Sequence, residues 1–187
     1  MFKKLREVFR GAEEADRDPA QNRTDSLVPL SRDELIIEVR GLKQDLLLND
    51  WLWLLPADSR PVVASKMGDL FVEAGEGSIF HLDTCTGDFQ MVAESRESFD
   101  VEMDSTHFRR DVLLSDLVAL KKLDGDIPTG HQCFSWVHPP VLGGSYEASN
   151  LEVSDLYVHL SITGQIHRQC KDLPPGTQVT GITFDET

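Results

Sequence analysis

The sequence lacks an apolar run long enough to cross a membrane. A spanning helix needs roughly 20 apolar residues in succession, whereas the densest apolar stretch, LLLNDWLWLLP, is interrupted by Asn49 and Asp50. The amino-terminal stretch MFKKLREVFRGAEEA has basic residues but no uninterrupted apolar segment, so it lacks the anatomy of a secretory signal. We therefore predict a cytoplasmic protein that does not insert into a membrane.

Cysteine is scarce, and the familiar catalytic motifs are missing. The three cysteines, Cys85, Cys133 and Cys170, are widely spaced and form no CxxC pair. An odd, scattered set favours free thiols in a reducing compartment over a disulfide framework. The sequence also contains no Walker loop and no GxGxxG, GxSxG or HExxH motif. These absences favour a protein that is not an enzyme and that holds no cofactor and no metal.

Basic residues are few relative to acidic ones. The chain has 32 Asp and Glu against 18 Lys and Arg, which gives a formal net charge of −14 at pH 7. The carboxylates are dense between Asp69 and Asp126. Such a field repels nucleic acid and attracts cationic partners, although an acidic surface also serves solubility alone. We predict that the protein binds no nucleic acid and that its protein partner is basic.

The length of 187 residues fits one domain with a sizeable core. Phe2, Leu5 and Phe9 share a helical stripe surrounded by basic residues, which predicts a short amphipathic helix. The residues that follow are rich in Glu, Asp, Arg, Asn and Pro, a composition typical of a flexible linker. We therefore divide the chain into a charged extension over residues 1–30 and one domain over residues 31–187. The sequence does not indicate the oligomeric state.

Periodicity and turn residues predict an α+β fold. Ser31 and Glu34 form a capping-box pair, from which we predict a helix that continues to about Leu48. The short segments VVAS, DLFVEA, SIFHLD and DFQMVA, separated by glycine turns, predict an antiparallel meander. Leucines at helical spacing predict a helix that ends at Lys121 and Lys122. Blocks of helices and strands without βαβ alternation favour a single α+β domain, mainly antiparallel sheet packed with helices.

The carboxy-terminal part is predicted to add three strands and a short helix. The strands are expected at Cys133–Val137, Leu156–Ile162 and Gln178–Phe184, and the helix at Gln165–Lys171. Alternation along the second strand places His159 on its more polar face. His167 is offset from the apolar stripe of the short helix. Both histidines are therefore expected to lie off the core.

Histidine and cysteine recur in GHQCFSWVH and VHLSITGQIHRQC, so a metal or thiol site has to be considered. A zinc site needs three or four converging ligands, but Cys170 is predicted to face the core and His167 is not. Cys133, with His131 and His138 nearby in the sequence, is the best candidate for a nucleophile. Free cysteines are more often packing residues. We therefore favour a scaffold over a metal or thiol site.

Two turns contain residues that could serve catalysis or phosphate binding. Asp83 and Asp88 meet across the Thr86-Gly87 turn if the hairpin forms, and paired carboxylates can perform acid–base catalysis, but an exposed acidic hairpin is the commoner case. Gly143-Gly144 follows PPVL and has no helix after it, so a tight structural loop is favoured over a phosphate cradle.

The segments GHQCFSWVHPPVLGGSY and VHLSITGQIHRQCKDLPPGT carry a family resemblance. Together with Asn150 and Asp155 between them, they resemble the C-terminal domain of bacterial immunity proteins that are paired with type VI secretion DNase effectors. Earlier, GDLFVEAGEGSIFHLDTCTGDF is similar to the two strands that precede in this family, so the likeness covers roughly Leu46 to Thr180. The resemblance implies a non-catalytic binding protein that neutralises a toxin by occupying it.

The acidic composition indicates how such a toxin would be bound. A nuclease presents cations to a phosphate backbone, so an acidic protein is drawn to that surface. We expect the partner-binding residues to be Asp69, Glu73, Glu76, Asp83, Asp88, His159 and His167. Two alternatives stay open: an adaptor that binds a peptide or small ligand beside Gly143-Gly144, and a metal protein or hydrolase that uses Cys133 and nearby histidines.

Overall fold

The computed structural model describes residues 27–174 and 176–185 of the chain. The predicted amphipathic helix and nearly all of the predicted linker lie outside these residues, so both stay predictions, as does the division at residue 30. The strands of the described residues are β1 (Ile36–Ile37), β2 (Arg60–Ser65), β3 (Leu70–Ala74), β4 (Ser78–Asp83), β5 (Asp88–Ala93), β6 (Gln132–Trp136) and β7 (Leu151–Asp155). The α-helices are α3 (Arg32–Leu35), α4 (Gln44–Leu48), α5 (Arg96–Met103), α6 (Thr106–Asp111), α7 (Ser115–Leu123) and α8 (Leu156–Cys170). Short 3₁₀ helices are η1 (Asn49–Trp51), η2 (Pro140–Leu142) and η3 (Ala148–Asn150).

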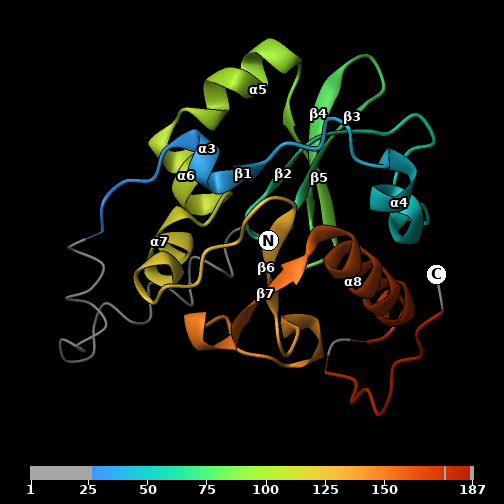
Figure 1. The fold of residues 1–187 in the computed structure, drawn as a ribbon. Coiled ribbons are helices and arrows are strands. Elements are labelled where there is room, and N and C mark those ends of the chain that lie inside the picture. The colour runs from blue at the N-terminus through green and yellow to red at the C-terminus, as the bar shows by residue number, and fades with distance from the viewer. Residues whose placement is uncertain (1–26, 175, 186–187) are drawn as a thin grey trace.

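The first five strands form one antiparallel sheet in chain order, and β6 pairs with β7 in a second, smaller sheet. The predicted meander is therefore confirmed as β2 to β5, and the α+β fold is confirmed with it. Figure 1 shows the large sheet between α5, α6 and α7 on one side and α4 and α8 on the other. The sheet therefore has two buried faces.

Alternation along the strands divides the core into two clusters, one on each face of the sheet. Phe71 and Ile79 point toward the cluster that contains Phe99 and Phe108 of α5 and α6. Leu70, Val72 and Leu82 belong to the cluster that contains Trp51, Leu156 and Leu160. Because successive side chains of a strand point to opposite faces, one five-residue strand such as β3 contributes to both clusters.

The predicted helix from Ser31 to about Leu48 is wrong beyond its first turn. The capping box of Ser31 and Glu34 is present, with the Ser31 backbone N–H donating to Glu34 at 2.9 Å. The chain then becomes extended, and β1 pairs with Ser65 and Ala64 of β2 before helix resumes at α4. Ile36 and Ile37 are β-branched and buried, so pairing at the edge of the sheet is more favourable for them than continuing the helix.

The predicted strand Leu156–Ile162 and the separate helix that follows it are wrong, because residues 156–170 form the single helix α8. Asp155 ends β7 and caps the helix, since its carboxylate accepts hydrogen bonds from the backbone N–H groups of Tyr157 and Val158 at 2.9 and 3.3 Å. Over so short a stretch, the apolar residues of LYVHLSI fit both the period of a strand and the period of a helix. Glycine is needed at position 164 of the helix because a Cβ there would come within 2.7 Å of the Asp50 carbonyl oxygen.

The predicted edge strand Gln178–Phe184 is also wrong, because these residues form no strand. They run alongside α8, whose side chains take the place of a partner strand. Gln169 donates to the Thr183 carbonyl at 2.8 Å, and Gln165 accepts from the Asp185 N–H at 2.8 Å. Glutamine suits this role because its amide group both donates and accepts.

Candidate functional site

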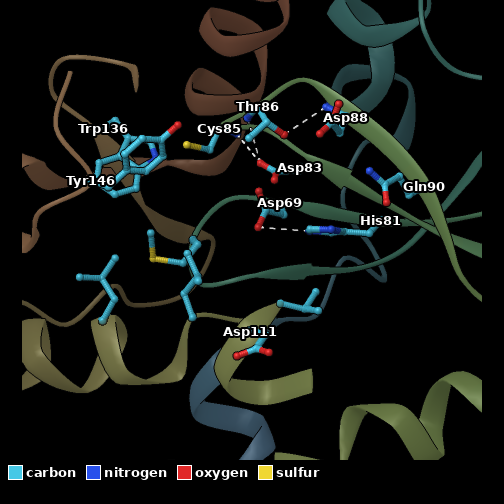
Figure 2. Close-up of a pocket in the computed structure, with 14 residues that line it drawn as sticks. Asp69, His81, Asp83, Cys85, Thr86, Asp88, Gln90, Asp111, Trp136 and Tyr146 are labelled. Atoms are coloured by element: carbon cyan, nitrogen blue, oxygen red, sulfur yellow. Dashed lines mark hydrogen bonds and ion pairs between the residues drawn. The ribbon is translucent and has the colours of Figure 1, made fainter. Parts of the chain in front are cut away.

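An acidic pocket opens at one end of the large sheet, where the turns β2–β3 and β4–β5 approach α6, α7 and β6 (Figure 2). It has a volume of about 50 Å³. Its charged walls are Asp69, His81, Asp83, Asp88 and Asp111. Trp136 and Tyr146 line another side, with ring centroids 5.8 Å apart in an edge-on arrangement. The acidic pocket is the candidate site because it brings carboxylates from separate segments of the chain to one place.

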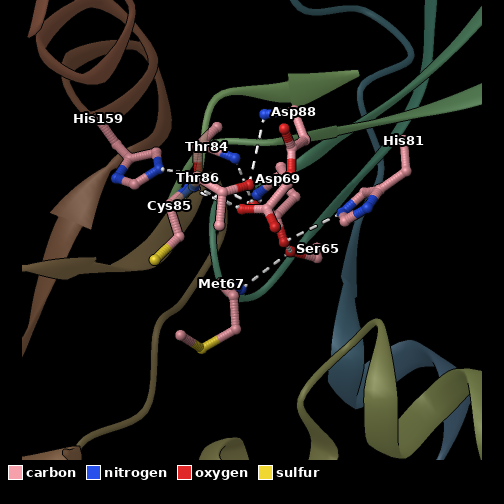
Figure 3. A network of polar contacts seen from close by, with 10 residues as sticks. Ser65, Met67, Asp69, His81, Thr84, Cys85, Thr86, Asp88 and His159 are labelled. Carbon is pink, nitrogen blue, oxygen red and sulfur yellow. Dashed lines mark hydrogen bonds and ion pairs between the residues drawn. The ribbon is translucent and has the colours of Figure 1, made fainter. Parts of the chain in front are cut away.

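Asp69 belongs to a buried network beside the acidic pocket (Figure 3). One of its carboxylate oxygens accepts from the backbone N–H and the hydroxyl of Thr84 at 2.9 and 3.0 Å, and the other accepts from the Ser65 hydroxyl at 3.3 Å. Burial raises the pKa of Asp69, but the proton and charge of His81 and the donors of Thr84 outweigh it, so the pKa is lowered. Asp69 is ionised and 5% exposed, so it lies at the buried end of the pocket.

His81 is the residue of this network that faces Asp69. Its ring stacks on Phe71 at 5.0 Å and is 5% exposed. Burial lowers the pKa of His81, but Asp69, Asp83 and Asp88 together raise it above its usual value. Nε2 lies 3.4 Å from Asp69 Oδ2, an ion-pair distance without hydrogen-bond alignment, and it has no hydrogen-bond partner in the described part of the chain.

His159 and His167 are buried, and the expectation that they lie off the core is wrong. They are 1% and 6% exposed. Because residues 156–170 are one helix, His159 and His167 stand two helical turns apart on the same face of α8, which packs on the turns of the sheet. His159 Nε2 lies 3.0 Å from the Thr84 hydroxyl, and His167 Nε2 lies 3.0 Å from the Thr84 carbonyl oxygen. Both histidines therefore fasten α8 to one residue of the β4–β5 turn.

The direction of these hydrogen bonds fixes the tautomer of His159. The Thr84 hydroxyl gives its proton to Asp69, so it accepts from His159, whose Nε2 therefore carries hydrogen. Nδ1 then accepts from the Ser135 hydroxyl at 2.9 Å. Burial lowers the pKa of His159 to about 4 and also lowers the pKa of His167. Both rings are neutral at pH 7, as this relay of donors requires.

Glycines in two turns make room for the histidine rings. A Cβ at Gly68 would lie 2.3 Å from His159 Nε2, and a Cβ at Gly87 would lie 2.6 Å from His167 Nδ1. Both glycines have positive φ, +86° and +73°. The MGD and TGD turns therefore need glycine twice, for the backbone conformation and for the close approach of α8.

The residues predicted to bind a partner do not form one surface. Asp83 and Asp88 come together at the acidic pocket, and Asp69 lies behind them. Glu73 and Glu76 lie at the opposite end of the β3–β4 hairpin. There Glu73 pairs with Arg96 at 3.2 Å and Glu76 is exposed in the turn. His159 and His167 lie inside the protein. A contact with a partner therefore stays a prediction only for those of the seven residues whose side chains reach the surface or the pocket.

Asp83 and Asp88 face each other across the β4–β5 hairpin, as the sequence predicted. The expectation of an exposed acidic hairpin is wrong, because none of residues 83–88 is exposed. Asp83 Oδ1 accepts from the backbone N–H groups of Cys85 and Thr86 at 2.9 and 3.0 Å, which closes the turn. Burial and the nearby charge of Asp69 raise the pKa of Asp83. Neither Asp83 nor Asp88 forms an ion pair with a Lys or Arg in residues 27–174 and 176–185.

The cysteines have the environment of packing residues. Cys133 is fully buried. Burial raises the pKa of its thiol, and burial with the charges of Asp83 and Asp69 raises that of Cys85. Burial also raises the pKa of Cys170. Because the thiolate is the nucleophile, none of these thiols is activated.

We expect all three thiols to react slowly with Ellman's reagent at pH 7 while the protein is folded, and Cys85 and Cys133 to react only as it unfolds. The half-buried Cys170 at the end of α8 is expected to react first. The same assay in denaturant gives the rate for accessible thiols. One thiol that reacts faster in the folded protein than in denaturant would contradict this and would revive the hydrolase alternative.

The Gly143-Gly144 loop is structural, in agreement with the sequence. A Cβ at Gly144 would lie 1.7 Å from the His138 carbonyl oxygen. Asn150 holds the loop, since its side chain donates to the carbonyls of His138 and Ser145 at 2.8 and 2.7 Å. The groove beside the loop has a volume of about 20 Å³, room for roughly one or two water-sized groups. Nothing in its size favours the ligand-binding adaptor.

In the residues that the structure describes, no group of three or more His, Cys, Asp or Glu side chains is arranged to hold a metal ion. His131 and His138 are both exposed, whereas Cys133 is buried. None of the described helices is long and apolar enough to cross a membrane.

Part of the second half of the chain is similar to a known protein family. Residues 93–167, from the end of β5 to His167 in α8, match the family model described as T6SS immunity protein Tdi1, C-terminal. This segment is similar to a domain of type VI secretion immunity proteins. Among solved structures, the crystal structure of Atu4351 from Agrobacterium tumefaciens is similar, with 14% identity and a TM-score of 0.49 over 74% of this chain and 70% of that chain. No curated protein matches the chain.

The acidic pocket spans the boundary of the matched immunity-protein segment. Asp111, Trp136 and Tyr146 lie within it, whereas Asp69 and His81 precede it. Sequence reasoning missed Asp111, Trp136 and Tyr146, because they are far apart in the chain and form no motif. It missed the histidine relay because the strand assignment put His159 on an outer face. The eight-residue spacing of His159 and His167, two turns of a helix, was the available signal.

Proposed function

We propose that this chain is an immunity-type protein that neutralises a type VI secreted toxin by binding it. The observation that carries the proposal is the match of residues 93–167 to the C-terminal domain of an immunity-protein family. Raised thiol pKa values and the absence of a metal-binding group in the described residues agree with a role in binding. In this proposal the protein performs no chemistry and acts by covering a surface of its partner.

The toxin is proposed to be a basic nuclease. A nuclease has to present cations to phosphates, and the net charge of −14 makes this chain attractive to such a surface. Within the immunity-protein segment, α5 and its flanks carry Glu94, Glu97, Asp100, Glu102 and Asp104, all exposed. Among the described residues, Asp100 pairs with Arg32 and Asp104 pairs with Arg109, and no ion pair of the other three is found there. Much of the acidic charge is thus free to face a partner, and we propose that the two proteins meet in the cytoplasm, where a nuclease finds its substrate.

The test is a titration of the chain with the toxin encoded by the neighbouring gene, at about 50 and about 300 mM salt. We expect one-to-one saturation, a faster association at low salt, and loss of the toxin's nuclease activity in step with binding. A toxin that cleaves no nucleic acid yet is bound would remove the nuclease from the proposal. Absence of binding at both salt concentrations would overturn the immunity function itself.

A further inference from the structure

In the described part of the chain, the large sheet ends at β5. The strand order is β1-β2-β3-β4-β5, so β5 pairs with β4 on one side and with no described strand on the other. The only backbone–backbone hydrogen bonds of Phe89 to Ala93 within residues 27–174 and 176–185 are those of the β4–β5 ladder. Alternate N–H and C=O groups of an edge strand point away from the sheet. The backbone of β5 therefore presents donors and acceptors to a further strand.

The strand β5 lacks the features that usually protect a sheet edge. Natural edge strands are blocked by lysine or proline, or are very short. The sequence of β5, DFQMVA, has six residues and contains neither lysine nor proline. Gln90 is exposed and Met91 is 55% exposed. The register with β4 is regular over Asp88–Met91. An exposed and regular edge of this kind is a template for an added strand.

The two faces of β5 differ in their chemistry. Asp88 and Gln90 line the acidic pocket on one face (Figure 2). Phe89 and Met91 alternate to the other face, where the Phe89 ring stacks on Phe80 with centroids 4.9 Å apart. A strand added beside β5 would lie about 4.8 Å away and continue both faces. Its alternate side chains would therefore meet acidic and polar groups on one face and apolar groups on the other.

The charges beside β5 favour a basic strand. Asp83 and Asp88 form no ion pair with Lys or Arg in the described residues. Glu94, which follows β5, is exposed and is likewise without an ion pair there. Opposite charges on neighbouring strands attract and like charges repel. A second copy of this chain, with its net charge of −14 and its own Asp88, is therefore disfavoured as the neighbour.

We propose that β5 binds an extended segment of the toxin as an added strand, in which basic side chains alternate with apolar ones. That the segment belongs to the toxin rests on the proposed function; the free edge of the sheet does not. Backbone hydrogen bonds to β5 supply affinity, and the alternate side chains supply specificity. The basic side chains lie over Asp88 and Gln90, and the apolar ones lie over Phe89 and Met91.

The probe for the edge alone is a capped peptide of about eight residues in which lysine and valine alternate, titrated into the full chain labelled with ¹⁵N. We expect the backbone amide signals of Asp88–Met91 to shift saturably, and the outward-pointing amides among them to become protected from hydrogen exchange. The control peptide has the same composition in two blocks, all lysines before all valines. It has the same charge but cannot match the two faces, so it is expected to leave β5 unprotected.

A pair of N-methylated peptides tests whether the backbone of the probe is bound. In an extended chain the amides of alternate residues point to opposite edges, so lysine amides lie on one edge and valine amides on the other. One peptide is methylated at its lysine amides and the other at its valine amides. A strand added in one orientation loses binding at least about tenfold with one peptide and keeps it with the other. Equal binding of the two peptides would overturn the inference, since side chains alone would then hold the probe.

Variants of the protein locate the interaction. Gln90→Lys places on β5 the cation that commonly blocks an edge, and we expect it to weaken binding of the alternating peptide about tenfold. Gln44→Lys is the matched control, because Gln44 is also exposed but belongs to α4. It makes the same change of charge and is expected to leave binding unchanged. Equal effects of the two variants would show attraction to net charge only and would overturn the inference.

Hydrogen exchange with the toxin encoded by the neighbouring gene identifies the source of the strand. If the toxin supplies it, Asp88–Met91 become protected in the complex, and Gln90→Lys weakens toxin binding while Gln44→Lys does not. A bound toxin that leaves these amides exchanging as before would overturn the inference and spare the proposed function. If the peptide binds β5 and no toxin binds, the edge stands as a site for a basic strand and the proposed immunity function falls. Protection that grows with protein concentration alone would show pairing of two copies and would also overturn the inference.

Discussion

Replacing Gly68 by alanine is expected to cost about 3–8 kcal/mol of folding free energy, a large part of the stability of a single domain. The added methyl group would lie 2.3 Å from His159 Nε2 at a backbone φ of +86°. The left-handed backbone costs about 1–2 kcal/mol. Overpacking adds about 1–3 kcal/mol, and displacing His159 from Thr84 leaves buried polar groups unpaired for about 1–3 kcal/mol more. Urea unfolding followed by circular dichroism measures the sum.

Gly41→Ala is the matched control for this prediction. Its φ of +89° is nearly the same, but a Cβ there meets nothing within 4 Å, so we expect only the backbone cost of about 1–2 kcal/mol. A double-mutant cycle then isolates the contact. In a His159→Ala background the methyl group has space, and Gly68→Ala is expected to cost no more than Gly41→Ala does. An equal cost of Gly68→Ala in both backgrounds would show that the ring is not what excludes the side chain.

Acid is expected to loosen the same helix. The pKa of His159 is about 4 in the folded protein and 6.5 when unperturbed. The unfolded chain therefore binds more protons below pH 6.5, and stability is complete above this pH and falls as the pH decreases toward 4. The expected contribution of His159 is about 3 kcal/mol. His167, whose pKa is also lowered by burial, acts in the same direction.

Subtracting a variant separates His159 from the carboxylates that titrate in the same range. His159→Gln keeps a donor and an acceptor for Thr84 and Ser135 but does not titrate. Unfolding is measured at several pH values from 7.5 to 4, and the advantage of the wild type over the variant is expected to shrink steadily below pH 6.5. Two stability curves that stay parallel would contradict the neutral, buried state of His159.

Together these two predictions describe α8 as a helix locked to the sheet through Thr84. Asp69 accepts a hydrogen bond from Thr84, and His159 and His167 donate to Thr84. One residue therefore joins the β2–β3 turn, α8 and the β4–β5 turn. The same turn supplies Asp83 and Cys85 to the acidic pocket. The histidines are therefore positioning residues for that wall of the candidate site.

Elements with a strong local signal were predicted well. The meander β2 to β5 follows from short β-branched segments and glycine turns, and the capping box of Ser31 and Glu34 follows from two residues three apart. The helix α7 was predicted from leucine spacing, and it ends one residue after Lys122. In each case the interaction that decides the structure lies within a few residues along the chain.

Elements that depend on distant partners were predicted poorly. The segment LYVHLSI satisfies the periods of both a strand and a helix, and the choice was made by Asp155 capping it and by Trp51 packing against it, with the Trp51 indole donating to the Leu160 carbonyl at 3.0 Å. Ile36 and Ile37, predicted to be helical, form a strand because they pair with β2. A local pattern shows the period of apolar residues but not which distant element will cover them.

The sequence by itself determined the α+β class, the acidic charge, the free cysteines and the resemblance of the second half to an immunity-protein domain. Composition and short-range spacing are sufficient for these properties. Only the tertiary structure decided that His159 and His167 are interior, that Asp69 is buried and ionised, and that Asp83 and Asp88 share a pocket with Trp136 and Tyr146. Burial and pKa depend on the groups that surround an atom in space, and those groups come from segments that the chain order keeps far apart.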